Sequence, residues 1–190
     1  MFNLLILIVV AYIVLLVTLY YRYYIMAFFM EFFDIFAWEN SKNINVYIPA
    51  ESTYSQAMEQ CFKKWEEVTQ HNISFHYIND KEIADIEVIF KSKFDSNEIK
   101  WYDFDIGRTT LQFSDKPKMT INIVQKDNAV GRYLKDDEII NIMLHEIGHS
   151  IGLWKHSCNK KSVMYAKIDK ETEQKILKED IARLSKIYKF

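Results

Sequence analysis

The chain has 190 residues, which is enough for one domain with a hydrophobic core and a short appendage. Its formal net charge of -2 argues against a nucleic-acid-binding protein, because such proteins present a basic face. Four glycines and two prolines argue against collagen-like or low-complexity segments.

The appendage is N-terminal and strongly apolar. No charged side chain lies between Met1 and Arg22, and about twenty helical residues span about 30 Å, the thickness of a bilayer's hydrocarbon core. A cleaved signal peptide is the alternative, but the basic start, short apolar region and small-residue cleavage site of such peptides are missing. We therefore expect an uncleaved, single-pass transmembrane helix within an N-terminal segment of residues 1–41.

Aromatic residues follow the apolar run. Eight of them lie between Tyr23 and Trp38, with Glu31 and Asp34 on one helical side. Because Tyr and Trp rings favour the headgroup region, the pattern predicts an interfacial helix. Two alternatives stay open: the segment continues the membrane helix, or it packs on the globular domain.

Residues 42–190 have the pattern of one α+β domain. A helix is predicted from Tyr54 to Val68, capped by Ser52 or Thr53, because apolar residues recur there at spacings of three and four. A closing amphipathic helix is predicted from Leu177 to Tyr188. Alternating apolar residues predict four strands, at 44–48, 73–77, 85–90 and 119–124.

The stretch from Lys91 to Asp115 is irregular and acidic. Carboxylate oxygens are the ligands that Ca²⁺ prefers. A calcium site and an ordinary solvated loop both remain open here. The carboxylates concerned are Asp95, Glu98, Asp103, Asp105 and Asp115.

The strongest chemical pattern begins at His145. Three acidic residues at 136–138 predict the start of a helix, where negative charge faces the positive end of the helix dipole. On that helix His145 and His149 lie one turn apart on the same face, with Glu146 beside them. This is the H-E-x-x-H arrangement, in which two imidazoles bind zinc and the glutamate transfers protons.

The sequence after this helix adds a third candidate ligand. The helix is expected to end at Gly152, because glycine accepts the left-handed conformation that turns the chain away. The turn can then bring His156 back to the same ion, and Met164 follows within Ser162–Tyr165. With these residues in this order, the chain resembles the metzincin metallopeptidases, and most closely the matrixins, whose pattern is H-E-x-x-H-x-x-G-x-x-H followed by a methionine turn.

The chain departs from that pattern at one point. Three residues, 153–155, separate Gly152 from His156, where the matrixin pattern has two. If the extra residue keeps His156 off the metal, Glu171 or Glu173 would complete the site, as in thermolysin-like enzymes.

The resemblance implies a metzincin-like catalytic domain over residues 42–190: a twisted mixed sheet with three helices and zinc on the second long helix. Met164 would form an apolar floor beneath the imidazoles without binding the metal. The strand at 119–124 would border the cleft and pair with an extended substrate. Matrixins also hold calcium and a second zinc in the region of residues 91–115, but no histidine lies between His76 and His145, so a second zinc is not expected.

The resulting hypothesis is a membrane-anchored zinc endopeptidase that acts on proteins or peptides. Glu146 would take a proton from the attacking water and return it to the leaving amine. The rival is a catalytically silent, membrane-bound interaction protein on the same fold. The charge rule has only Arg22 to use and weakly places the domain in the cytoplasm; the resemblance places it outside, and we follow the resemblance.

Overall fold

The computed structural model describes residues 10–15, 17, 34, 36–92, 106–113, 116–127, 131–167 and 172–190. Residues 10–15 and 17 are helical. These residues belong to the predicted transmembrane helix, but the rest of that helix and most of the aromatic segment lie outside the described residues. Among those that are described, no helix has the length and apolar character needed to cross a bilayer.

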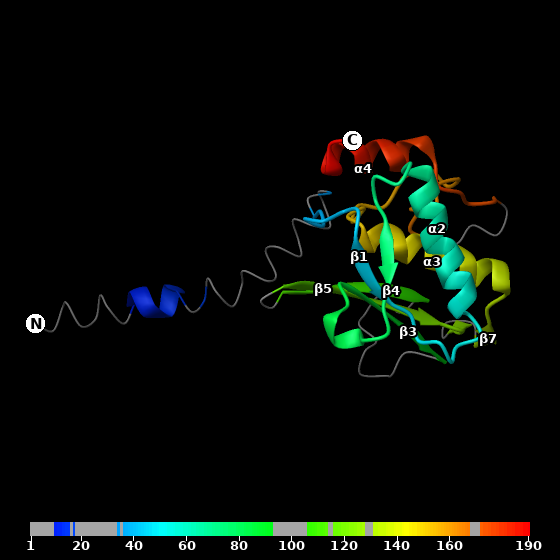
Figure 1. Ribbon diagram of the computed structural model, residues 1–190, viewed down its shortest axis with the longest axis horizontal. Helices are drawn as coiled ribbons and strands as arrows, with labels where there is room; N and C mark the ends of the chain where they lie inside the picture. Colours follow the sequence, from blue (N-terminus) through cyan, green and yellow to red (C-terminus); the bar gives the residue numbers. More distant parts are fainter. Residues whose placement is uncertain are drawn as a thin grey trace, which may run out of the picture.

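A five-stranded mixed sheet supports the domain (Figure 1). In spatial order its strands are β2-β1-β3-β5-β4; the pairs β1–β2, β1–β3 and β3–β5 are parallel, and β4 is antiparallel to β5. The four predicted strands are confirmed, and the fifth, β4, was not predicted. The strands are β1 (Ile44–Tyr47), β2 (Phe75–Tyr77), β3 (Ile86–Lys91), β4 (Gly107–Phe113) and β5 (Pro117–Val124), with a separate pair β6 (Lys126–Asp127) and β7 (Arg132–Tyr133).

The strand predicted to pair with substrate needs correction. β5 lies between β3 and β4, so Ile121 faces Val88 on one side and Thr109 on the other. A peptide cannot add to a strand whose two sides are both paired. Within the described residues, the strand at this edge of the sheet is β4. Its sequence, GRTTLQF, lacks the strict apolar alternation by which the other strands were recognised.

Among its described residues the domain also has three α-helices: α2 (Ser55–Val68), α3 (Asp136–Ser150) and α4 (Lys178–Tyr188). A short 3-10 helix spans Lys81–Ile83. Helix α3 packs against α2 on one side and against β4 and β5 on the other, and α4 lies across the end of the domain (Figure 1). The predicted α+β class with three helices is confirmed.

The start of α2 differs from the prediction. Its N-cap position is Tyr54, and no side chain caps the helix. Ser52 instead accepts a hydrogen bond at Oγ from the Tyr54 backbone N–H, at 3.2 Å, within the turn that precedes the helix. Ser52 and Thr53, the expected caps, therefore precede the N-cap position of α2. The Ser52 hydroxyl is bound within the preceding turn and does not cap the helix.

Helix α3 is fixed by its own apolar side. Ile139, Met143, Ile147 and Ile151 recur every four residues, and all four are 0% exposed. The Trp65 indole of α2 donates a hydrogen bond to the Leu144 carbonyl of α3 at 3.0 Å. A helix held in this way is a rigid mounting for the polar side chains on its other faces.

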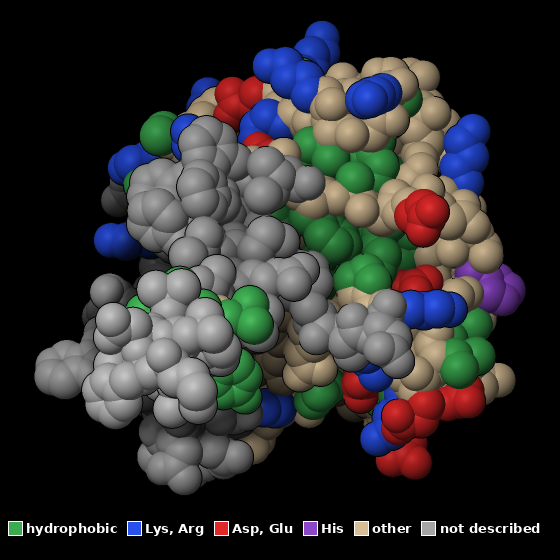
Figure 2. Space-filling model, turned by 90° about the vertical axis from the view of Figure 1, so that its left-hand side faces the viewer, with side chains coloured by type: hydrophobic (Ala, Val, Ile, Leu, Met, Phe, Trp, Pro, Cys, Tyr) green, Lys and Arg blue, Asp and Glu red, His purple; other side chains and the backbone are tan. Residues whose placement is uncertain are grey.

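One face of the domain mixes hydrophobic side chains with charged side chains of both signs (Figure 2). Figure 2 shows one face, on whose described part hydrophobic side chains lie near the centre, with Lys and Arg side chains above and below them and Asp and Glu side chains mainly to the right and below. This mixture agrees with the small net charge of the chain. The described surface on this face therefore carries both signs of charge (Figure 2).

Trp38, at the end of the aromatic segment, belongs to the core of the domain. Its side chain is 7% exposed, and its Nε1–H donates to the Ser150 carbonyl at 2.9 Å. The described end of the aromatic segment therefore packs on the globular domain, in agreement with the second alternative for that segment.

Candidate metal centre

Helix α3 begins at Asp136, where the three acidic residues predicted a helix start. Glu138 accepts a hydrogen bond from the Lys135 backbone N–H at 2.9 Å, and it forms a two-pronged ion pair with Arg132. The carboxylate thus satisfies a free N–H at the helix start and lies near the positive end of the dipole. This fixes the first turn of the helix that carries the two histidines.

The structure brings His145, His149 and His156 together. One ring nitrogen from each lies within 4.8 Å of the others. His145 and His149 come from successive turns of α3, with ring centroids 4.5 Å apart, and the His156 ring lies 5.1 Å and 5.0 Å from them. Imidazole nitrogens grouped in this way are a suitable ligand set for zinc.

The hydrogen bonds of the first two rings show which nitrogens are free to bind a cation. Nδ1 of His145 faces the Val163 carbonyl oxygen at 2.7 Å, and Nδ1 of His149 faces the Leu153 carbonyl oxygen at 2.7 Å. A carbonyl can only accept, so each Nδ1 carries the proton and each Nε2 carries a lone pair. The two Nε2 atoms are 2.9 Å apart, and two lone pairs at that distance repel unless a cation lies against both. The donor set therefore fits a metal ion.

Burial keeps both rings in the neutral form that a metal requires. Burial lowers the pKa of the His145 imidazole to about 4, and it holds the pKa of His149 well below the ordinary value. The neighbouring imidazoles lower both pKa values further. At neutral pH no proton then competes for the two Nε2 atoms.

The turn after α3 forms at the predicted glycine. Gly152 has φ +110°, and the Leu153 N–H donates to the Gly148 carbonyl at 2.9 Å, which closes the helix end. The Leu153 carbonyl in turn accepts from His149. The same turn therefore ends the helix, orients the second histidine and directs the chain toward His156.

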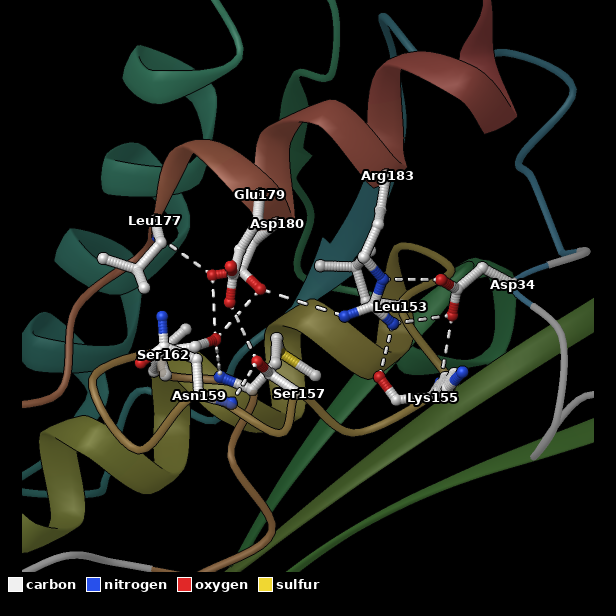
Figure 3. Close-up of polar contacts among 12 residues, drawn as sticks. Asp34, Leu153, Lys155, Ser157, Asn159, Ser162, Leu177, Glu179, Asp180 and Arg183 are labelled. Carbon is white, nitrogen blue, oxygen red and sulfur yellow. Dashed lines mark hydrogen bonds and ion pairs between the residues drawn. The ribbon is translucent and has the colours of Figure 1, made fainter.

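The methionine turn packs against helix α3 at Gly148, between the two helical histidines in sequence. Met164 is 0% exposed and packs against Gly148, and its backbone N–H donates to Ser162 Oγ at 2.9 Å. The Ser162 hydroxyl contacts both carboxylate oxygens of buried Asp180 at 2.9 Å, and the Leu177 N–H donates to Asp180 at 2.9 Å (Figure 3). Helix α4 thereby holds the turn in place, and the turn supplies the Val163 carbonyl to His145.

Replacing Gly148 with alanine is expected to lower the free energy of unfolding by about 1–3 kcal/mol, the usual cost of overpacking a core. A Cβ at this position would lie 2.3 Å from Met164 Sδ and 3.2 Å from Trp65 Cζ2. Both neighbours are 0% exposed and have no free space to enter. The urea midpoint of the zinc-free protein measures the effect. Combining Gly148→Ala with Met164→Ala should cost less than the sum of the two single changes; an unchanged midpoint for Gly148→Ala alone would contradict this packing.

The side chain of Glu146 points from α3 toward the edge strand, β4. Its side chain is 5% exposed, and Thr109 Oγ1 on β4 contacts its Oε2 at 2.7 Å and its backbone carbonyl at 3.0 Å. A Cβ at Gly107 would lie 2.7 Å from Glu146 Oε1, so only glycine allows β4 to approach this closely. Thr109 was missed from the sequence because its strand was not recognised, and nothing in the sequence places that hydroxyl beside Glu146.

Of the two alternative ligands, only Glu173 is described, and it does not lie with the three histidines. Glu173 has a side chain 77% exposed and pairs with Lys175 at 2.9 Å. Glu171 lies outside the described residues. So do the five carboxylates considered for calcium, and the calcium prediction stays a prediction.

Comparison with known proteins agrees with this geometry. The family model for matrixins matches residues 37–189. Metalloendoproteinase 1 of Glycine max is 29% identical over 147 residues, an alignment that covers 73% of this chain and 46% of the relative. The chain thus spans about half the length of this relative.

Proposed function

Because this chain belongs to the matrixin family, we propose that it is a zinc-dependent endopeptidase in which Glu146 is the general base and acid. The observation that carries the proposal is the convergence of three imidazoles, two of them with Nε2 atoms 2.9 Å apart. Beside them a buried carboxylate lies against the edge strand of the sheet.

The three histidines would hold the ion through ring nitrogens. When bound, zinc supplies polarisation of the scissile carbonyl and acidifies the attacking water. The Val163 and Leu153 carbonyls keep the proton of His145 and His149 on Nδ1, which leaves Nε2 for the ion.

Glu146 performs the proton transfers in this proposal. Its carboxylate accepts a proton from the attacking water and delivers that proton to the departing amine, so one group acts first as base and then as acid. Thr109 Oγ1 holds one carboxylate oxygen, which helps to fix the plane of the group.

The substrate is proposed to be a peptide in extended form. β4 is paired with β5 along one side, and among the described strands it has no partner along the other. An extended peptide can add to that side through main-chain hydrogen bonds, which tolerate many sequences. Thr109 would then hold Glu146 from the strand that aligns the substrate.

Replacing Thr109 with valine is expected to reduce kcat roughly 10- to 100-fold with little change in KM. Valine keeps the shape but removes the donor to the Glu146 carboxylate, and a hydrogen bond to a charged group is worth about 1.5–3 kcal/mol. Steady-state cleavage of a fluorogenic peptide measures both constants. Thr120→Val on β5 is the matched control. Thr120 pairs with Thr110, the residue after Thr109, so its side chain lies on the opposite face of the sheet from the Thr109 side chain. Equal effects of the two variants would count against a positioning role for Thr109.

The proposed function is tested on the full-length chain in a mild detergent. Bound zinc is measured by elemental analysis, and cleavage is followed on an unfolded protein and on a peptide library. We expect one zinc per chain and cleavage that stops with a chelator and returns with added zinc. Zinc without cleavage would favour the rival, a silent interaction protein; absence of zinc would refute the proposal.

A membrane anchor and an extracytoplasmic catalytic domain are part of the proposal. They are supported by the uncharged run from Met1 to Arg22 and by the mostly extracytoplasmic action of matrixin-like peptidases. The chain should stay with membranes after alkaline extraction, and its C-terminal domain should be digested by a protease added to intact cells. Release from the membranes would contradict the anchor, and protection of the domain would contradict the orientation.

A further inference from the structure

The end of the N-terminal segment lies along the turn that leads to the third histidine. The Trp38 indole donates to the carbonyl of Ser150, the last residue of α3. Two residues earlier, the Phe36 carbonyl oxygen lies so close to Gly152 that a Cβ on this glycine would be 2.3 Å from it. The segment and the turn therefore run side by side in opposite directions.

The next contact of this segment grips the residue before His156. Asp34 Oδ1 accepts the Lys155 backbone N–H at 3.0 Å. Arg183 of α4 donates to both carboxylate oxygens of Asp34, at 2.7 Å and 2.9 Å, and also to the Lys155 carbonyl (Figure 3). Both backbone groups of Lys155 are thus bound by one two-pronged ion pair, the strong form of this interaction.

This contact lies where the chain has one residue more than the matrixin pattern. The longer stretch between Gly152 and His156 has more conformations to lose on ordering. Fixing the peptide groups on both sides of Lys155 removes most of that freedom one residue before the ligand. We propose that Asp34 and Arg183 form a clamp that directs His156 toward the other two histidines. They are positioning residues for the proposed metal site, and the inference rests on that proposed function.

The clamp is separable from the contacts that attach the segment to the domain. The Tyr188 hydroxyl donates to the Ile151 carbonyl at 2.9 Å and accepts from the Trp38 N–H at 3.3 Å. These contacts and the buried Trp38 ring do not involve Asp34. Changing Asp34 to asparagine should therefore leave the segment attached while the charge that holds Arg183 is lost.

The test compares zinc affinities of full-length chains in detergent, measured by competition with a chromophoric chelator. The variants are Asp34→Asn, Arg183→Gln and the double variant, with Arg183→Lys as a milder second change at that site. Glu87→Gln is the matched control, because Glu87 and Lys118 form a 2.8 Å ion pair with side chains similarly exposed, at 17% and 25%, against 16% and 22% in the Asp34–Arg183 pair. Visible absorption of the Co²⁺-substituted protein and the melting temperatures of the zinc-free and zinc-bound forms are recorded for each.

We expect each single change to weaken zinc binding about tenfold, in the range found for groups that orient a ligand, and the double change to add little more. The cobalt spectrum should change, and the rise in melting temperature on zinc binding should shrink, since that rise depends on affinity. The control should match the wild type in all three. Unchanged zinc affinity and cobalt spectra in the variants would overturn the clamp, even if they melt earlier. A wild-type chain that binds no zinc would overturn the proposed function as well.

Discussion

Replacing Glu146 with glutamine is expected to lower kcat/KM for peptide cleavage by roughly 10²–10⁴-fold while one zinc stays bound, because that is the usual contribution of a general acid–base group. Glutamine has nearly the same shape, and its carbonyl oxygen can still accept from Thr109 Oγ1. It cannot take a proton from water at neutral pH. The loss should therefore fall on kcat, with the metal site intact.

The measurement pairs steady-state kinetics with elemental analysis of the same samples. Glu138→Gln is the matched control: it lies on the same helix and is similarly buried, but its partners are Arg132 and the Lys135 N–H at the helix start. That change should lower the melting temperature and have little effect on kcat. A Glu146→Gln variant that keeps most of its activity would exclude the proton-transfer role, and one that loses its zinc would make Glu146 a ligand.

The helical half of the site could be predicted from the sequence because it depends on local geometry. A spacing of four places His145 and His149 on one face of any helix, and a glycine after the last turn ends that helix. The apolar positions from Ile139 to Ile151 fix which side faces the core. The structure agrees on each of these points, and no contact distant in the chain was needed to foresee them.

The other half depends on contacts that are remote in sequence. The path of the chain from Gly152 to His156 is set by Asp34 and Arg183, which are separated by 149 positions and carry no recognisable motif. Which strand lies at the edge depends on the order of the strands in the sheet. β5 follows β4 in the chain, yet β5 lies in the interior of the sheet and β4 lies at its edge. Local alternation identifies a strand but does not say whether its two sides are paired, so the substrate edge was assigned to the wrong strand.

Replacing His156 with glutamine is expected to weaken zinc binding by more than about 100-fold, beyond the roughly 10–100-fold lost when only an outer partner of a ligand is changed. His156 is exposed in the described structure, so the zinc-free fold should melt at the wild-type temperature. The loss of affinity would therefore come from the missing His156 ring nitrogen, which is one of three ligand atoms that lie within 4.8 Å of one another.

Zinc retained after dialysis against a weak chelator measures this loss, and Glu173→Gln separates the histidine set from a thermolysin-like set completed by Glu173. With the histidine set, Glu173→Gln keeps full zinc because its carboxylate is exposed and pairs with Lys175. With a thermolysin-like set that includes Glu173, the same change would remove the metal, and His156→Gln would keep it. The two variants therefore give opposite results under the two hypotheses. If the histidine set is correct, the extra residue before His156 has lengthened the turn without removing the third ligand, and the clamp at Lys155 gives the physical reason.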